Sequence, residues 1–204
     1  MKVAEARDGD IILRIFQDED PIDQREMCDY LGKMVCWHRM YNLGDKHDFE
    51  TPDDFLNSID KERSILLPLY LYDHSGLRMK VGSFNGLLPQ GHAEWDTMQV
   101  GWIYCSHEYA LDECKWGQET DGETLAKAER MLCAEVKEYD QYLNGDIYGF
   151  NLIEVEHCDL GHEHEEVMDS CWGFYGYGDW KENGMMEHVP EEYQYLFDRL
   201  EDCQ

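Results

Sequence analysis

Negative charge dominates this sequence and limits how the chain can fold. Its 204 residues contain 45 aspartates and glutamates against 17 lysines and arginines, a formal net charge of −28. On duplex DNA, which carries about one charge per 1.7 Å, that number of charges spans roughly 48 Å. A compact chain of this length has a diameter of roughly 43 Å. The charge per unit length therefore matches that of DNA, and self-repulsion must destabilise the folded state.

The rest of the composition predicts a folded, intracellular protein. Hydrophobic residues make up 43% of the chain and aromatic residues 13%, which is enough for a packed core. No run approaches the ~18–20 apolar residues of a membrane span. The first ten residues, MKVAEARDGD, lack the apolar segment of a secretory signal. The eight cysteines form no CxxC pair, so we expect reduced and mostly buried thiols.

Apolar runs and turn signals predict an α+β fold. Strands are expected at 11–17, from 34, and at 65–73, 98–105, 146–156 and 167–175, the last two as an antiparallel pair. Pro68 indicates an edge or a bulge. Short helices are expected at 22–31, 53–61, 106–116 and 191–203, and a long irregular connection at 74–96.

The clearest helix begins at the capping pattern Thr120-x-x-Glu123 and ends at Gly145. Apolar residues recur within it at steps of three and four: Leu125, Ala128, Leu132, Val136, Tyr139 and Leu143. We therefore predict one mixed or antiparallel sheet of about five strands, packed with the amphipathic helix 122–143 and the shorter helices. Residues 1–204 would form a single acidic domain, to which 177–204 could add a C-terminal helical appendage.

Several stretches are distinctive as a set: MVCWHRMYNLGDKHDF (34–49), LPLYLYDHSG (67–76), QVGWIY (99–104), YDQYLNGDIYGF (139–150) and DSCWGFYG (169–176). They resemble an uncharacterised family of small acidic proteins from phages and mobile elements of Gram-positive bacteria. The resemblance implies one domain and a mobile-element setting in the host bacterial cytoplasm, without an established reaction. In those relatives a short acidic turn joins the last two strands, whereas here the connection is longer, which is typical of a hairpin loop.

The stretch EVEHCDLGHEHEEVMDSC (154–171) raises the question of a metal site. His157, His162 and His164 are weak candidate ligands, because their spacing fits neither structural zinc nor the HExxH pattern. We interpret His157–Glu166 as the solvated acidic tip of a hairpin, and we expect neither a metal nor a cofactor. Cys171, with Trp172 and Phe174 close beside it in the sequence, is interpreted as a packing residue.

Two other stretches suggest chemistry. Asp73, His74 and Ser75 suggest a catalytic triad, but adjacent residues at a strand end point to opposite faces, which favours a turn. Residues 42–54 suggest a calcium loop but lack its alternating ligands. We therefore expect that the protein has no enzymatic activity. The alternatives are a small metal-dependent enzyme that uses Asp73, His74 and the histidine-rich loop, or an intracellular interaction module whose acidity is incidental.

The acidity itself has three explanations: solubility or salt adaptation, binding of multivalent cations, and binding of a basic protein. The third leads to our main hypothesis, a nucleic-acid mimic that inhibits a host defence nuclease of the anti-restriction or anti-CRISPR type. The negative field would repel nucleic acid, so no direct nucleic-acid binding is expected, and no membrane. The expected contact residues are the densest carboxylates: Asp18, Glu19, Asp20, Asp23, Glu26, Asp45, Asp48, Glu50, Asp53, Asp54, Glu163, Glu165, Glu166, Glu191 and Glu192.

Overall fold

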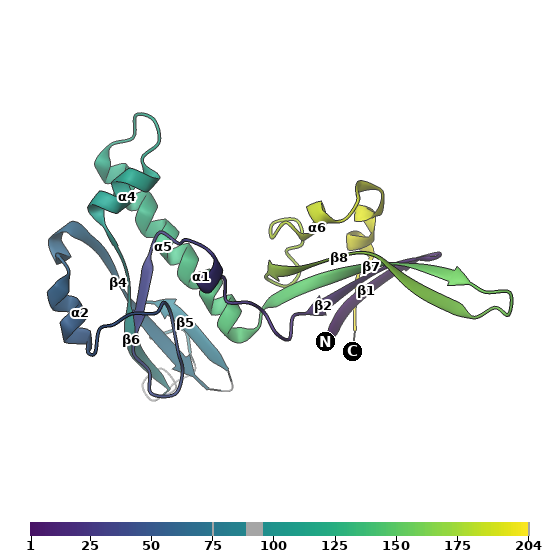
Figure 1. The fold of residues 1–204 in the computed structure, drawn as a ribbon, viewed down its shortest axis with the longest axis horizontal. Helices are drawn as coiled ribbons and strands as arrows, with labels where there is room; N and C mark the ends of the chain where they lie inside the picture. The colour runs from purple at the N-terminus through teal and green to yellow at the C-terminus, as the bar shows by residue number, and fades with distance from the viewer. Residues whose placement is uncertain (75, 89–95, 204) are drawn as a thin grey trace. The chain divides into compact units, whose positions relative to one another are not determined.

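A computed structural model describes residues 1–74, 76–88 and 96–203. It confirms the predicted α+β class, with two antiparallel sheets and several helices (Figure 1). Residue contacts divide the chain into two compact units. The first contains Met1–Ile22 and Gly145–Gln204, and the second contains Asp23–Asn144. The predicted single domain over 1–204 stays a prediction.

The first unit is built on a five-stranded antiparallel sheet in the order β8-β7-β2-β1-β9. Its strands are β1 Lys2–Asp8, β2 Ile11–Gln17, β7 Ile147–His157, β8 Glu163–Tyr175 and β9 Glu201–Asp202. The apolar runs of β2 and β7 lie side by side, with Leu13 opposite Leu152 and Ile15 opposite Phe150. The sequence prediction missed β1, although its alternating buried residues, Ala4 and Ala6, fit a strand with one buried face.

The C-terminal segment covers one face of this sheet. It contains the short helix α6, Met185–His188, and the 3-10 helix η2, Glu191–Arg199. Met185, Leu196 and Phe197 share a core with β2 and β7. The predicted helix over 191–203 is therefore present but too long, and it is of the 3-10 type. The backbone edge of β1 takes up Glu201 and Asp202 as β9, which ends the helix.

The second unit is built on a four-stranded antiparallel sheet in the order β3-β6-β4-β5. Its strands are β3 Lys33–Cys36, β4 Ser64–Asp73, β5 Leu77–Val81 and β6 Thr97–Ser106. The pairing of β4 with β6 shifts register between Leu69 and Tyr70, next to Pro68, which fits the bulge of the two alternatives predicted from this proline. An irregular connection was expected over 74–96. This prediction is wrong for Leu77–Val81, which form strand β5 and pair with β4. Residues 89–95 of that connection lie outside the described residues.

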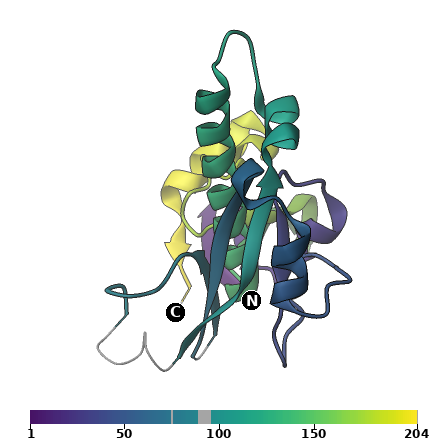
Figure 2. The ribbon, with the colours of Figure 1, turned by 90° about the vertical axis from the view of Figure 1, so that its left-hand side faces the viewer.

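The helices of the second unit are α1 Gln24–Met27, α2 Pro52–Ser58, the 3-10 turn η1 Lys61–Arg63, α4 His107–Cys114 and α5 Asp121–Asn144. The predicted stripe on α5 is confirmed, since Ala128, Leu132 and Val136 are buried in the core of this unit. Helices α4 and α5 lie side by side, joined by the loop 115–120 (Figure 2). Among the described residues, no helix combines the length and apolar character that a membrane crossing requires.

Helix α1 is much shorter than the predicted helix 22–31. After Met27 the backbone is extended at Cys28, and side chains rather than helical hydrogen bonds hold the following residues. Glu135 of α5 accepts the backbone N–H groups of Leu31 and Gly32, and Arg25 donates to the Gly32 carbonyl. Glu135 lies more than 100 positions from Leu31 and Gly32, so local sequence signals could not reveal this partner.

Candidate functional site

The β7–β8 hairpin carries the densest group of carboxylates in the first unit. A tight turn over 158–162 closes it, with Gly161 at φ 79°. The two strands pair from Ile147 opposite Tyr175 to His157 opposite Glu163. The predicted antiparallel pair is thus confirmed, but the predicted tip 157–166 is too long, because residues 163–166 already belong to β8. Directly opposite residues share one face of a sheet, so the hairpin sorts its side chains onto two faces.

One of these faces neutralises its carboxylates with arginines, and we call it the arginine face. Arg14 donates to both carboxylate oxygens of Glu165 at 2.5 and 2.7 Å, and to Glu5 at 2.6 Å. Arg7 donates to Glu163 at 2.8 and 3.3 Å. These long side chains lie on the same face as Ile12, which is buried. Hydrogen bonds from the arginines lower the pKa of Glu163 and of Glu165 below the ordinary value.

The opposite face of the hairpin, which we call the acidic face, holds Glu154, Glu156, Glu166 and Asp169. All four are exposed. Within the described ranges none of them forms an ion pair with a lysine, arginine or histidine. Glu154 lies directly opposite Glu166, a like-charge pair that costs stability. This face therefore keeps its negative charge.

The spacing of the acidic face can be compared with that of a nucleic acid. Asp169 lies opposite Leu152, and the group extends along β7 to Glu156. Four residue steps along a strand cover about 13 Å. Four carboxylates over that length give one charge per about 3.4 Å, which is the charge density of one strand of B-DNA. Of these four carboxylates only Glu166 was predicted from the sequence, although the alternation in EVEH is a signal for the two on β7, Glu154 and Glu156.

The hairpin histidines do not converge on one point. His157 lies opposite Glu163, with its Nε2 3.5 Å from that carboxylate and its Nδ1 3.9 Å from Asp10. His164 lies opposite Glu156, on the other face, and His162 lies in the turn. In the part of the chain that the structure describes, no three histidines, cysteines or carboxylates form a group able to hold a metal ion.

The other carboxylates predicted for the first unit lie in two further segments, residues 18–20 and the start of η2. Strand β2 runs from Ile11, opposite Glu154, to Gln17, opposite Tyr148, so residues 18–20 follow its far end. There Glu19 pairs with the N-terminal ammonium group at 2.6 Å, and Asp18 accepts the N–H of Asp20. Glu191 and Glu192 are exposed in the first turn of η2.

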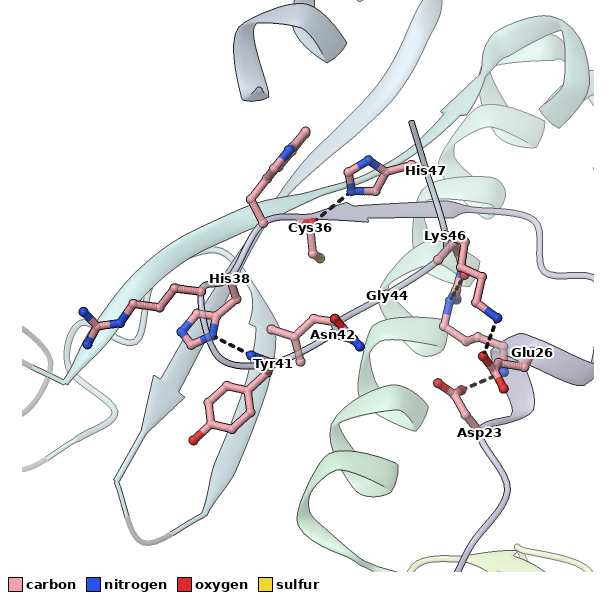
Figure 3. Close-up of a pocket in the computed structure, with 14 residues that line it drawn as sticks. Asp23, Glu26, Cys36, His38, Tyr41, Asn42, Gly44, Lys46 and His47 are labelled. Carbon is pink, nitrogen blue, oxygen red and sulfur yellow. Dashed lines mark hydrogen bonds and ion pairs between the residues drawn. The ribbon is translucent and has the colours of Figure 1, made fainter. Parts of the chain in front are cut away.

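In the second unit, three predicted carboxylates line a cavity of about 910 Å³: Asp23, Glu26 and Asp45. Figure 3 shows Asp23 and Glu26 on one side of this pocket, His38 and Tyr41 on the other, and Asn42 between them. The remaining predicted carboxylates of this unit lie outside the pocket. Asp48 and Glu50 are exposed, Asp53 is in the first turn of α2, and Asp54 forms a capping box with Thr51.

Basic side chains balance the carboxylates of this pocket. Arg25, whose side chain is 4% exposed, donates to both oxygens of Asp45 at 2.8 Å, and it lies 3.5 Å from Glu135. Lys46 pairs with Glu26 at 3.0 Å. Burial raises the pKa of Asp23 and of Glu135 above the ordinary value. The pocket is consequently a mixed polar site, unlike the acidic face of the hairpin.

The pocket also contains a cysteine and a histidine, but not as a nucleophile and its base. His47 makes its hydrogen bond through Nε2 to the backbone carbonyl of Cys36, at 2.9 Å. Burial raises the pKa of the Cys36 thiol to about 12, which keeps it protonated near neutral pH. Cys171, on β8, is half-buried beside the core of the first unit.

The strand end suggested as a triad also departs from that arrangement. The imidazole Nδ1 of His74 lies 3.7 Å from Asp96. Asp73 interacts instead with Tyr41, whose pKa is raised mainly by burial and further by this carboxylate. Ser75, the third member of the suggested triad, lies outside the described residues.

Comparisons of the chain with protein-family models, curated proteins and solved structures found no match.

Proposed function

We propose that this protein is an acidic nucleic-acid mimic that inhibits a host defence nuclease, of the anti-restriction or anti-CRISPR type. It would compete with DNA or RNA for the basic groove of that enzyme. One observation carries the proposal: the acidic face presents four carboxylates at the linear charge density of a nucleic-acid strand, and among the described residues no lysine, arginine or histidine forms an ion pair with them.

In this mechanism the carboxylates of the acidic face take the place of phosphates. Lysines and arginines of the groove, which normally pair with phosphate oxygens, pair with Glu154, Glu156, Glu166 and Asp169 instead. The net charge of −28 attracts the basic partner over longer distances and speeds association. The repulsion between Glu154 and Glu166 destabilises the unbound protein. A cation of the partner that comes between them relieves this repulsion, which adds to the free energy of binding.

The remaining predicted carboxylates have secondary roles in this proposal. Glu163 and Glu165 already hold Arg7 and Arg14, so a partner would have to replace those arginines to use them. Glu191 and Glu192 belong to the same unit as the hairpin and extend its negative field. The exposed carboxylates of the second unit contribute to long-range attraction only.

The proposal also defines the setting. The protein acts without catalysis or cofactor and binds neither nucleic acid nor membrane. Its partner is a basic nucleic-acid-binding protein in the host bacterial cytoplasm. A phage or mobile element of Gram-positive bacteria would supply it, as the resemblance of its sequence stretches implies.

The test is inhibition of DNA cleavage by a panel of purified restriction endonucleases and RNA-guided nucleases. We expect inhibition at low salt that disappears near ~1 M salt. A variant with Glu154→Gln, Glu156→Gln, Glu166→Gln and Asp169→Asn should lose most of it. The slope of log affinity against log salt should fall by about 3–4, since each lost contact lowers it by about 0.9.

A matched control separates the acidic face from bulk charge. The variant Asp179→Asn, Glu182→Gln, Glu187→Gln and Asp198→Asn removes the same charge from exposed positions of the same unit. It should inhibit nearly as well as the unchanged protein. If both variants weaken inhibition equally, net charge alone is responsible. If the unchanged protein inhibits no enzyme at low salt, or inhibits equally at ~1 M salt, the mimic proposal is wrong.

A further inference from the structure

Strand β8 forms one edge of the five-stranded sheet. Only β7 lies beside it in the strand order, and its other side has no neighbouring strand among the described residues. Alternate residues of an edge strand direct their backbone N–H and C=O groups outward, where they can pair with another chain. We propose that the edge of β8 at residues 163–167 binds an extended, lysine- or arginine-rich segment of the target as an added strand. This inference rests on the proposed function and specifies how the partner is held.

The backbone defines where such a strand can pair. The register with β7 is regular from Glu163 to Val167, and it shifts next to Met168. The regular stretch has five residues, which is close to the usual length of a strand. It contains no proline, and its residues are exposed. A ladder of backbone hydrogen bonds is therefore available over one ordinary strand length.

The side chains define what the added strand must carry. On the acidic face, Glu166 lies at the edge with Glu154 behind it, so a cation on the added strand would meet both. On the arginine face, Glu163 and Glu165 are already paired, and Arg7 and Arg14 would repel further cations. Because strand residues alternate between faces, the best segment has a basic residue at every second position and uncharged residues between.

Charge also argues against a second copy of this chain as the occupant. Pairing of two β8 edges would place the carboxylates of one copy beside those of the other, and like charges directly opposite are destabilising. Charged residues on an edge commonly prevent such self-pairing. The same carboxylates attract a basic strand. The edge thus discriminates between a copy of itself and a basic partner.

Synthetic peptides test the pairing without altering the fold of the protein. The first probe is Lys-Thr-Lys-Thr-Lys-Thr-Lys, which places all lysines on one face of a strand. The second has the same composition with its four lysines contiguous. Two further probes carry the first sequence with N-methyl groups on the odd or on the even residues, which remove half of the backbone donors and retain the charge. Fluorescence anisotropy of labelled peptides reports their binding.

We expect the alternating peptide to bind at least 10-fold more tightly than the contiguous peptide. It should also bind at least 10-fold more tightly than one of the two N-methylated peptides, because only alternate residues of the added strand pair with the edge. Glu166→Lys should weaken its binding at least 10-fold. Glu182→Lys, the same charge change at an exposed site of the same unit, should weaken it less than 3-fold. Circular dichroism of both variants establishes that the fold is retained.

The outcomes distinguish this inference from the proposed function. If all four peptides bind equally, attraction is purely electrostatic, and strand addition is wrong while nuclease inhibition can persist. If no peptide binds although a nuclease is inhibited, the edge is again not the binding element, and its charges only prevent self-association. If neither a peptide nor a nuclease binds, both proposals are wrong.

Discussion

Carboxylates of the second unit's interior and carboxylates of the acidic face are chemically the same but differ in what surrounds them. Asp45 accepts the backbone N–H of Met34 at 2.7 Å in addition to its pair with Arg25. Asp140 accepts the N–H of Met79 at 2.7 Å in addition to its pair with Arg78. On the acidic face, Glu154 and Glu166 face each other instead. The interior carboxylates hold the fold together, whereas those of the acidic face work against it.

The same contrast extends to the two units as wholes. The first unit carries 22 carboxylates against five lysines and arginines, a formal charge of −17. The second carries 23 against 12, a formal charge of −11. The first unit thus has most of the excess charge but few cations to balance it. Selection for stability alone would remove such repulsion, so we look to the first unit for binding and to the second for scaffold.

The largest expected effect is loss of stability in Asp45→Ala. This change leaves the buried guanidinium of Arg25 without its main partner, and removing one member of a buried pair costs about 3–5 kcal/mol. Urea denaturation measures the free energy of unfolding. Asp48→Ala, at an exposed position of the same segment, should change it by less than about 0.5 kcal/mol. A cost below about 1 kcal/mol for Asp45→Ala would remove the distinction between the two kinds of carboxylate.

A smaller loss is expected for Asp140→Asn. The amide oxygen can still accept the N–H of Met79, but the charged pair with Arg78 is lost. The Arg78 side chain is 56% exposed and can be rehydrated, so the cost should be about 1–3 kcal/mol. Asp112→Asn, on an exposed position of α4, is the control. Equal stability of the two variants would show that the Asp140 carboxylate does not hold β5.

Sequence reasoning could identify elements whose signals are local. The stripe on 122–143 and the apolar run of β7 each follow from spacing within a few turns or residues. It could not separate Asp45 from Asp48, because Arg25 and Glu135 lie 20 positions before and 90 positions after Asp45. The missed strands have a related cause. Strand β5 lies in a segment rich in glycine, and it is defined by its pairing with β4.

The candidate site was predictable only in part for the same reason. Glu163, Glu165 and Glu166 are consecutive or nearly so, and all were expected to contact a partner. Alternation along β8 places Glu163 and Glu165 on one face with the arginines and Glu166 on the other. Assigning them required the register with β7 and the positions of Arg7 and Arg14, more than 150 residues away. The density of carboxylates can be read from neighbouring residues in the sequence. Which of them are neutralised by an arginine depends on the fold and cannot be read in that way.

Glu135, in the interior of the second unit, and the two glutamates of the arginine face should respond to pH with opposite signs. Burial raises the pKa of Glu135, so its contribution to stability is full below its ordinary pKa of about 4.3 and is lost as pH rises through the raised value. Arginine hydrogen bonds lower the pKa of Glu163 and Glu165, so their contribution is present above that value and is lost as pH falls through the lowered ones.

Unfolding free energies measured in urea from about pH 3 to pH 8 would separate these contributions. Relative to the unchanged protein, Glu135→Gln should gain stability as pH rises above about 4.3. The double variant Glu163→Gln and Glu165→Gln should instead lose less stability on acidification below that pH. Glu129→Gln, exposed on the same helix as Glu135, should give a curve parallel to that of the unchanged protein. Parallel curves for Glu135→Gln would contradict the assigned sign.

The smallest effect, and the only expected gain at neutral pH, belongs to Glu166→Gln. This change removes the repulsion across the strand pair from Glu154 and should stabilise the protein by about 0.2–1 kcal/mol. The gain should shrink toward ~1 M salt, where charges on the surface are screened within about 3 Å. Glu165→Gln, one position earlier but paired with Arg14, should lower stability instead. A loss of stability in both variants would mean that the two faces of the hairpin do not differ. The predicted pattern, a more stable protein that inhibits less well, would mean that the charge on the acidic face is kept for a partner.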